Sequence, residues 1–126
     1  MPKDSPSIGL GHRHDWEAII IWLSSPASST ILGVSTSSHG EYKKYSVPNS
    51  KVNFVDNRIL IKYWNILFLN HHPDVTNKKG GEQPLIAWES LTEAARTSLQ
   101  TTDFGSATVP FKDSTLQDNL AKAWFR

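Results

Sequence analysis

The sequence predicts an α+β fold built on an antiparallel β-sheet. Segments rich in β-branched and aromatic residues, each bounded by turn residues, lie in the first half of the 126-residue chain. Segments with apolar residues at helical spacing appear only after residue 90. Because strands and helices come in separate blocks, an antiparallel sheet with short helices is favoured over a parallel sheet. The chain is long enough to form one domain, over residues 1–126, with a core of its own.

The first strands are predicted where apolar runs end at turn residues. Residues 18–23 (AIIIWL) form a buried strand that stops at a Ser-Ser-Pro turn. Residues 30–37 (TILGVSTS) form a second strand, in which Gly33 marks a bulge or a close approach of another group.

A hairpin and a long loop are predicted next. Residues 51–55 and 58–63 flank Asp56-Asn57, and both turn residues tolerate the positive φ that a tight hairpin needs. The segment 71–83 (HHPDVTNKKGGEQ) contains Pro, Asn and paired Gly, so we expect a loop there.

Helices are predicted at the C-terminal end. Ser90 and Glu93 have the spacing of a capping box, which opens a helix that continues to about Gln100. Asp113 or Ser114 caps a second short helix.

Composition narrows the classes of function. The net charge is +1, so the sequence lacks the excess of basic residues that is typical of nucleic-acid-binding proteins. There is no cysteine, so no disulfide framework holds the chain, and no apolar run approaches the roughly 20 residues of a bilayer span. The start, MPKDSPS, lacks the apolar region of a secretory signal.

The most unusual segment is GHRHDWE at residues 11–17. In an extended backbone Asp15 and Glu17 lie on one face, where two carboxylates repel unless a cation compensates. Hard divalent ions such as Ca²⁺ or Mg²⁺ prefer such oxygen ligands. The pair His12 and His14 would instead suit Zn²⁺. The turn that follows Asp4 can fold the chain back, so that Asp4 offers one more oxygen ligand. A solvated, charge-rich turn explains the same residues equally well.

The whole segment KDSPSIGLGHRHDWEAIIIWL resembles the signature of the necrosis- and ethylene-inducing peptide-like (NLP) proteins, a family of secreted cytolysins. The heptapeptide at 11–17 is that family's hallmark and is unaltered here. Three further segments resemble the family in the same order: Ser38-His39-Gly40, residues 80–91 (GGEQPLIAWESL) and residues 103–111 (DFGSATVPF).

The resemblance implies a β-sandwich flanked by short helices, similar to actinoporins and some fungal lectins. It also implies a divalent cation in an acidic pocket, needed for activity, with ligands that fall on Asp4, His12, Asp15 and Glu17. Three oxygen donors with one imidazole suit Ca²⁺ or Mg²⁺ better than a structural Zn²⁺.

The resemblance further implies a phytotoxic virulence factor that is not an enzyme. Such proteins bind the sugar head groups of plant plasma-membrane sphingolipids and damage the membrane surface. His39 corresponds to a pocket histidine, and Asn70-His71 end the loop that contacts the membrane. Arg13 either meets a lipid phosphate or pairs with a neighbouring acid. We expect a secreted monomer that binds no nucleic acid.

Two departures from the family pattern lead to alternatives. Members carry an upstream third, so we expect this chain to correspond to the C-terminal two thirds of the domain and to lack the N-terminal sandwich strands. The family's Trp-Pro pair in the membrane loop is replaced by Leu67-Phe68. An inert member, sensed by plants only as a molecular pattern, is therefore one alternative. The other is a metal-dependent hydrolase, in which Asp15 and Glu17 hold the ion and a histidine moves a proton.

Overall fold

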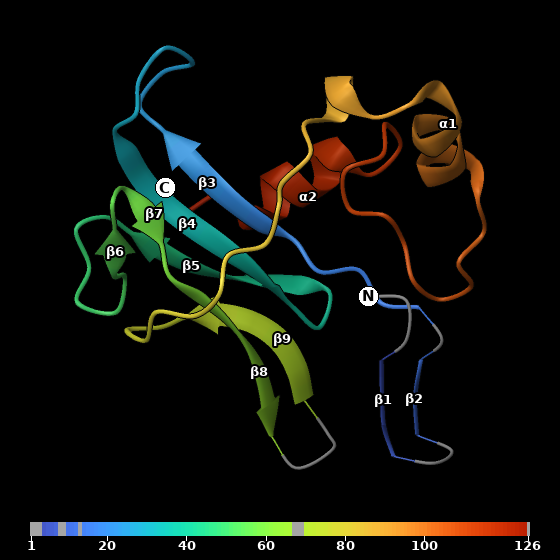
Figure 1. The fold of residues 1–126 in the computed structure, drawn as a ribbon, viewed down its shortest axis with the longest axis horizontal. Helices are drawn as coiled ribbons and strands as arrows, with labels where there is room; N and C mark the ends of the chain where they lie inside the picture. The colour runs from blue at the N-terminus through green and yellow to red at the C-terminus, as the bar shows by residue number, and fades with distance from the viewer. Residues whose placement is uncertain (1–3, 8–9, 13, 67–69, 126) are drawn as a thin grey trace. The chain divides into compact units, whose positions relative to one another are not determined.

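The computed structural model describes residues 4–7, 10–12, 14–66 and 70–125 (Figure 1). The chain forms two compact units: Met1–Trp16 with Gly81–Asn119, and Glu17–Gly80 with Leu120–Arg126. Antiparallel strands and short helices make up the described regular structure, which confirms the predicted α+β class. Within the described residues no helix is long and apolar enough to cross a membrane.

The first unit contains a small hairpin and most of the helical residues. Strands β1 (Asp4–Ser7) and β2 (Leu10–His12) pair antiparallel. They are followed, much later in the chain, by the 3₁₀ helix η1 (Trp88–Ser90) and helix α1 (Glu93–Thr101). Helix α2 (Leu116–Ala123) begins in this unit and ends in the second.

Both predicted helices exist, but the predicted caps were wrong. Thr92, not Ser90, caps α1: its backbone is extended and its side chain accepts a hydrogen bond from the amide of Ala95 at 3.2 Å. Ser90 instead ends the preceding 3₁₀ turn. Helix α2 begins later than Asp113 or Ser114 predicts, because the amides of Thr115 and Leu116 both donate to the carbonyl of Lys112 and close a turn first.

The second unit is built on the sheet β3-β4-β5, formed by Ile19–Leu23, Ile31–Ser38 and Glu41–Ser46. The hairpin of β6 (Phe54–Val55) and β7 (Arg58–Ile59) follows, and then the longer hairpin of β8 (Ile61–Ile66) and β9 (Asn70–Val75). The predicted strands 18–23 and 30–37 are confirmed as β3 and β4, but the predicted burial of the first was wrong: β3 is an edge strand on which Ile19, Ile21 and Leu23 are exposed. The predicted turn is confirmed too, since Asp56 and Asn57 have φ of 49° and 63°.

The predicted loop at 71–83 was wrong for residues 71–75, which belong to β9, and right for residues 76–83. Pro73 is the reason for this error, because proline is more typical of loops than of strands. Among the described strands β9 pairs only with β8, and a strand paired on one side accepts a proline, because the missing amide donor can face away from the ladder.

The core of the second unit lies between β4 and the β8–β9 hairpin. Val34, Val52 and Val75 are buried, and four partly buried apolar side chains pack against them: Tyr45, Val47, Ile59 and Ile61. Strands β4 and β9 lie against each other, so the two layers form a small sandwich. The core thereby fixes which polar residues of β5 and β9 face one another.

The end of the chain packs on β3 and β4. The hydroxyl of Ser35 donates to the carbonyl of Ala123 at 2.7 Å, and the rings of Trp22 and Trp124 meet edge to face at 4.8 Å. A Cβ at Gly33 would lie 2.7 Å from the ring of Phe125, so the close approach predicted at this glycine is confirmed.

Candidate functional site

The start of the signature segment is folded back on itself. The register of β1 and β2 pairs the Cα of Asp4 with that of His12. Two residues that the sequence predicts as metal ligands are therefore directly opposite each other on neighbouring strands. Two residues can bind the same ion only if their backbones lie close together, and directly opposite residues on paired strands are such close neighbours.

Glu17, the last predicted ligand, is held by the beginning of the sheet. Its carboxylate accepts a hydrogen bond from the hydroxyl of Ser37, and that hydroxyl accepts one from the amide of Ala18 at 2.9 Å. Burial raises the pKa of Tyr42, and the negative charge of Glu17 raises it further. The half-buried Glu17 is thus an ordered carboxylate.

The remaining predicted ligand, Asp15, is half-buried in the first unit. Within the part of the chain that the structure describes, no group of three or more His, Cys, Asp or Glu is arranged to hold a metal ion. The cation site at Asp4, His12, Asp15 and Glu17 therefore stays a prediction. Arg13 lies outside the described residues.

Aromatic contacts anchor the middle of the signature segment. His14 meets the ring of Phe104 at 5.3 Å, and Trp16 meets Phe104 at 5.4 Å and Phe111 at 6.1 Å. On the other side of Phe111 lies Trp88, at 5.9 Å. His14 is therefore in a packing contact with Phe104.

The predicted ligand-binding histidines lie in the second unit. His39 and Gly40 form the tight turn between β4 and β5, both with positive φ, and the ring of His39 is 5.8 Å from that of His72 on β9. His71 points elsewhere, toward Tyr63 at 6.0 Å between ring centroids. The structure thus brings His39 to His72, the neighbour of the predicted His71. The side chain of Asn70 lies outside the description.

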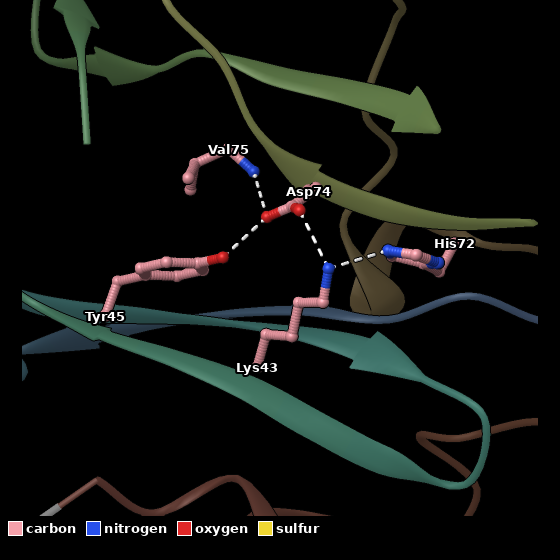
Figure 2. A network of polar contacts seen from close by, with 5 residues as sticks. All are labelled: Lys43, Tyr45, His72, Asp74 and Val75. Carbon is pink, nitrogen blue, oxygen red and sulfur yellow. Dashed lines mark hydrogen bonds and ion pairs between the residues drawn. The ribbon is translucent and has the colours of Figure 1, made fainter. Parts of the chain in front are cut away.

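A polar network joins β5 to β9 (Figure 2). The ammonium of Lys43 donates to Oδ2 of Asp74 at 2.9 Å and lies 2.8 Å from Nε2 of His72. The other carboxylate oxygen, Oδ1, accepts from the hydroxyl of Tyr45 at 2.7 Å and from the amide of Val75 at 2.9 Å. Asp74 therefore connects both strands through three donors.

The network sets the charge states of its members. Burial opposes ionisation of Asp74, but the hydrogen bonds from Lys43 and Tyr45 outweigh it, so the pKa of Asp74 lies below its usual value. Burial and the bond to Asp74 raise the pKa of Tyr45 to about 12. Burial lowers the pKa of His72, and the charge of Lys43 lowers it further, so His72 is neutral and accepts from Lys43 through Nε2.

Sequence reasoning missed this network. Neither Lys43 nor Asp74 stands in an apolar run, and 71–75 was interpreted as loop because of its proline. One signal was present: His72 and Asp74 are two residues apart, as polar residues on one face of a strand are.

The chain thus combines antiparallel strands in a small sandwich with a His- and acid-rich segment at residues 11–17 that precedes them in the sequence. Comparisons with known proteins identify the class of proteins that has these features. The family model of the necrosis inducing proteins (NPP1) matches residues 1–123. The chain belongs to this family.

Relatives agree with this assignment. NLP effector protein 10 of Phytophthora capsici is 52% identical over 128 residues, which cover 99% of this chain and 54% of that protein. NLP effector protein 14 of the same organism is 46% identical over 98% of this chain and 93% of its own length. The chain thus spans about half the length of the first curated relatives it matches.

Solved structures have the same fold. The complex of NLPPya with glucosamine has a TM-score of 0.88 and 46% identity, with all of this chain and 59% of that chain covered. The non-toxic HaNLP3 protein has a TM-score of 0.84 and 40% identity, over 98% of this chain and 58% of its own. The same fold therefore occurs in a protein described as non-toxic.

Proposed function

We propose that the chain is a necrosis-inducing virulence factor that acts outside the producing cell and binds glycosylated sphingolipid head groups of the plant plasma membrane with the help of a divalent cation. The observation that carries the proposal is the unaltered heptapeptide at residues 11–17, together with the backbone register that pairs its His12 with Asp4. A solved relative, NLPPya, is known in complex with glucosamine and with mannosamine, which supports a sugar as the ligand.

The proposed cation ligands are Asp4, His12, Asp15 and Glu17. When bound, Ca²⁺ or Mg²⁺ would supply a hard positive charge for the hydroxyl oxygens of a sugar. Glu17 suits this role because its hydrogen bond from Ser37 restricts the carboxylate before any ligand arrives, and less rotamer freedom is then lost on binding.

The proposed sugar contacts come from His39, Arg13, Asn70 and His71, as in the resemblance to the family. The tight turn at His39 and the contact of its ring with His72 restrict that imidazole. No bond of the lipid is made or broken in this proposal. Damage follows from binding at the membrane surface, and the binding unit is one copy of the chain.

Vesicles test the proposal. Dye-loaded vesicles that contain plant glycosylated sphingolipid are expected to bind the chain and leak in Ca²⁺, and to bind less after chelation by EDTA. Vesicles of phosphatidylcholine alone serve as the control. Equal binding to both, or hydrolysis of soluble phosphate or sugar esters by the chain, would contradict the proposal and favour a metal-dependent hydrolase.

A second candidate function has a specific observation in its favour. HaNLP3 is non-toxic although it is 40% identical to this chain, and here the family's Trp-Pro pair is replaced by Leu67-Phe68. Tryptophan favours the bilayer interface more than leucine does. Binding to sphingolipid vesicles without leakage, together with a plant immune response, would identify a molecular pattern rather than a cytolysin.

A further inference from the structure

A groove in the second unit is separate from the residues discussed so far as cation ligands. It has a volume of about 570 Å³ and is lined by β5, β8, β9 and the segment before β6. The polar residues that line it include Lys43, Lys51, Asn53, Lys62, Asp74 and Thr76. The volume falls within the range of about 300–1,000 Å³ typical of small-molecule sites. The groove is therefore large enough for a sugar with one attached group.

The charge in the groove is unbalanced. Three lysines line it, but Asp74 is its one carboxylate among the described lining residues. Lys43 already neutralises Asp74 at 2.9 Å. Among the described residues no ion pair involves Lys51 or Lys62. Two ammonium groups thus remain to attract an anion.

Local contacts hold the ammonium of Lys62 and the backbone of Lys51. The ammonium of Lys62 lies 3.6 Å from the centre of the Trp64 ring, a cation–π contact that limits its freedom. The backbone of Lys51 is held from two sides, because its amide donates to Asn49 and its carbonyl accepts from the side chain of Asn53, both at 3.0 Å. Less order then has to be imposed when a ligand binds.

Four residues of the network in Figure 2, Lys43, Tyr45, Asp74 and Val75, line this groove. Tyr45 and Asp74 satisfy each other at 2.7 Å, and the pKa of Tyr45, about 12, keeps its hydroxyl protonated. Neutral donors and acceptors such as Asn53 and Thr76 remain around the two lysines. Such a surface suits hydroxyl groups beside an anionic centre.

We propose that this groove binds the phosphate monoester or diester of a polyhydroxylated compound, with Lys51 and Lys62 on the phosphate. The ligand is either a soluble sugar phosphate or the sugar-phosphate head group of a lipid. The site goes beyond the proposed function, since none of Asp4, His12, Asp15 or Glu17 lines it.

Calorimetry at low ionic strength tests the proposal with glucose 6-phosphate and with glucose. We expect binding of glucose 6-phosphate only, an affinity that falls as salt is added, and at least a tenfold loss in Lys51→Gln/Lys62→Gln. The matched control is Lys78→Gln/Lys79→Gln, which makes the same change of charge outside the groove and is expected to stay within twofold. Equal losses in both double variants, or equal binding of glucose, would overturn the proposal.

A third variant and a vesicle assay complete the test. Lys62→Arg keeps a positive charge at this position and is expected to retain binding, whereas a loss as large as that of Lys51→Gln/Lys62→Gln would contradict a role for the charge of Lys62. Vesicles with phosphatidylinositol, compared with phosphatidylcholine alone, show whether a lipid head group also binds. Ca²⁺ titration of Lys51→Gln/Lys62→Gln is expected to be unchanged, so failure here is separable from failure of the proposed cation site.

Discussion

His72 is buried, with 6% of its surface exposed, and lies between an ammonium and a second imidazole. Burial lowers its pKa from 6.5, Lys43 and His39 lower it further, and Asp74 opposes them. The folded-state pKa is thus below the unfolded value. The stability that depends on neutral His72 is therefore fully present above pH 6.5 and is lost as the pH falls through the folded pKa.

This linkage predicts a pH-dependent melting temperature. Between pH 7.5 and pH 5.5 the melting temperature is expected to fall, and His72→Gln is expected to flatten the slope because it cannot be protonated. Titration of Asp74 does not account for a fall in melting temperature between pH 7.5 and pH 5.5, since the folded-state pKa of Asp74 lies below 3.8. His71→Gln is the neighbouring control, measured in the same scans. A slope that His72→Gln leaves unchanged would rule out His72 as its source.

The hairpin turn between β6 and β7 gives a prediction at the scale of elements. Asn57 has a φ of 63°, a conformation that costs an ordinary L-residue about 1–2 kcal/mol. Asn57→Ala is therefore expected to lower the free energy of unfolding by about 1 kcal/mol, and Asn57→Gly to leave it equal or higher. Urea denaturation measures both. An alanine variant as stable as the glycine variant would show that the left-handed conformation is not required.

The cap of α1 gives a second prediction at this scale. Thr92 accepts a hydrogen bond from the amide of Ala95, whereas Ser90 caps no helix. Thr92→Ala is expected to cost about 1 kcal/mol, and Ser90→Ala is expected to cost less. Thermal unfolding of the two variants compares them directly, and the reverse order would support the capping box that the sequence predicted.

The elements differ in how well the sequence predicts them. Strands β3 and β4 and the turn at Asp56-Asn57 were predicted because apolar runs and turn residues act locally. Strand β9 was missed because most of its residues are polar and one is a proline, although its partner β8 lies directly before it in the sequence. The contact of Lys43 with Asp74 depends on that strand, so the sequence did not predict this contact either. The family signature predicted residue types for a site, whereas the register of Asp4 with His12 needed the structure.

At the scale of the whole molecule, exposed apolar surface is conspicuous. Strand β3 is at the edge of its sheet, and alternate side chains on it, Ile19, Ile21 and Leu23, are 46%, 47% and 44% exposed. Leu85 is 97% exposed. Apolar side chains along an unpaired strand edge favour association and dye binding.

Dye fluorescence tests this surface. The chain is expected to enhance the fluorescence of an apolar dye such as ANS, and Ile19→Thr/Ile21→Thr is expected to reduce the enhancement with little change in melting temperature. Threonine keeps the β-branched shape that suits a strand. Unchanged fluorescence in that variant would show that β3 is not the surface that binds the dye.

The proposed function requires that the signature segment bind a divalent cation. Calorimetric titration with Ca²⁺ and with Mg²⁺ measures this binding, in the unaltered chain and in Asp15→Asn, Glu17→Gln, His12→Ala and His14→Ala. Glu17→Gln keeps an acceptor for Ser37, so a loss reports on charge rather than on folding. We predict one site, at least tenfold weaker in both acid variants and weaker in His12→Ala than in His14→Ala. Unchanged binding in both acid variants, or no binding by the unaltered chain, would contradict the claim.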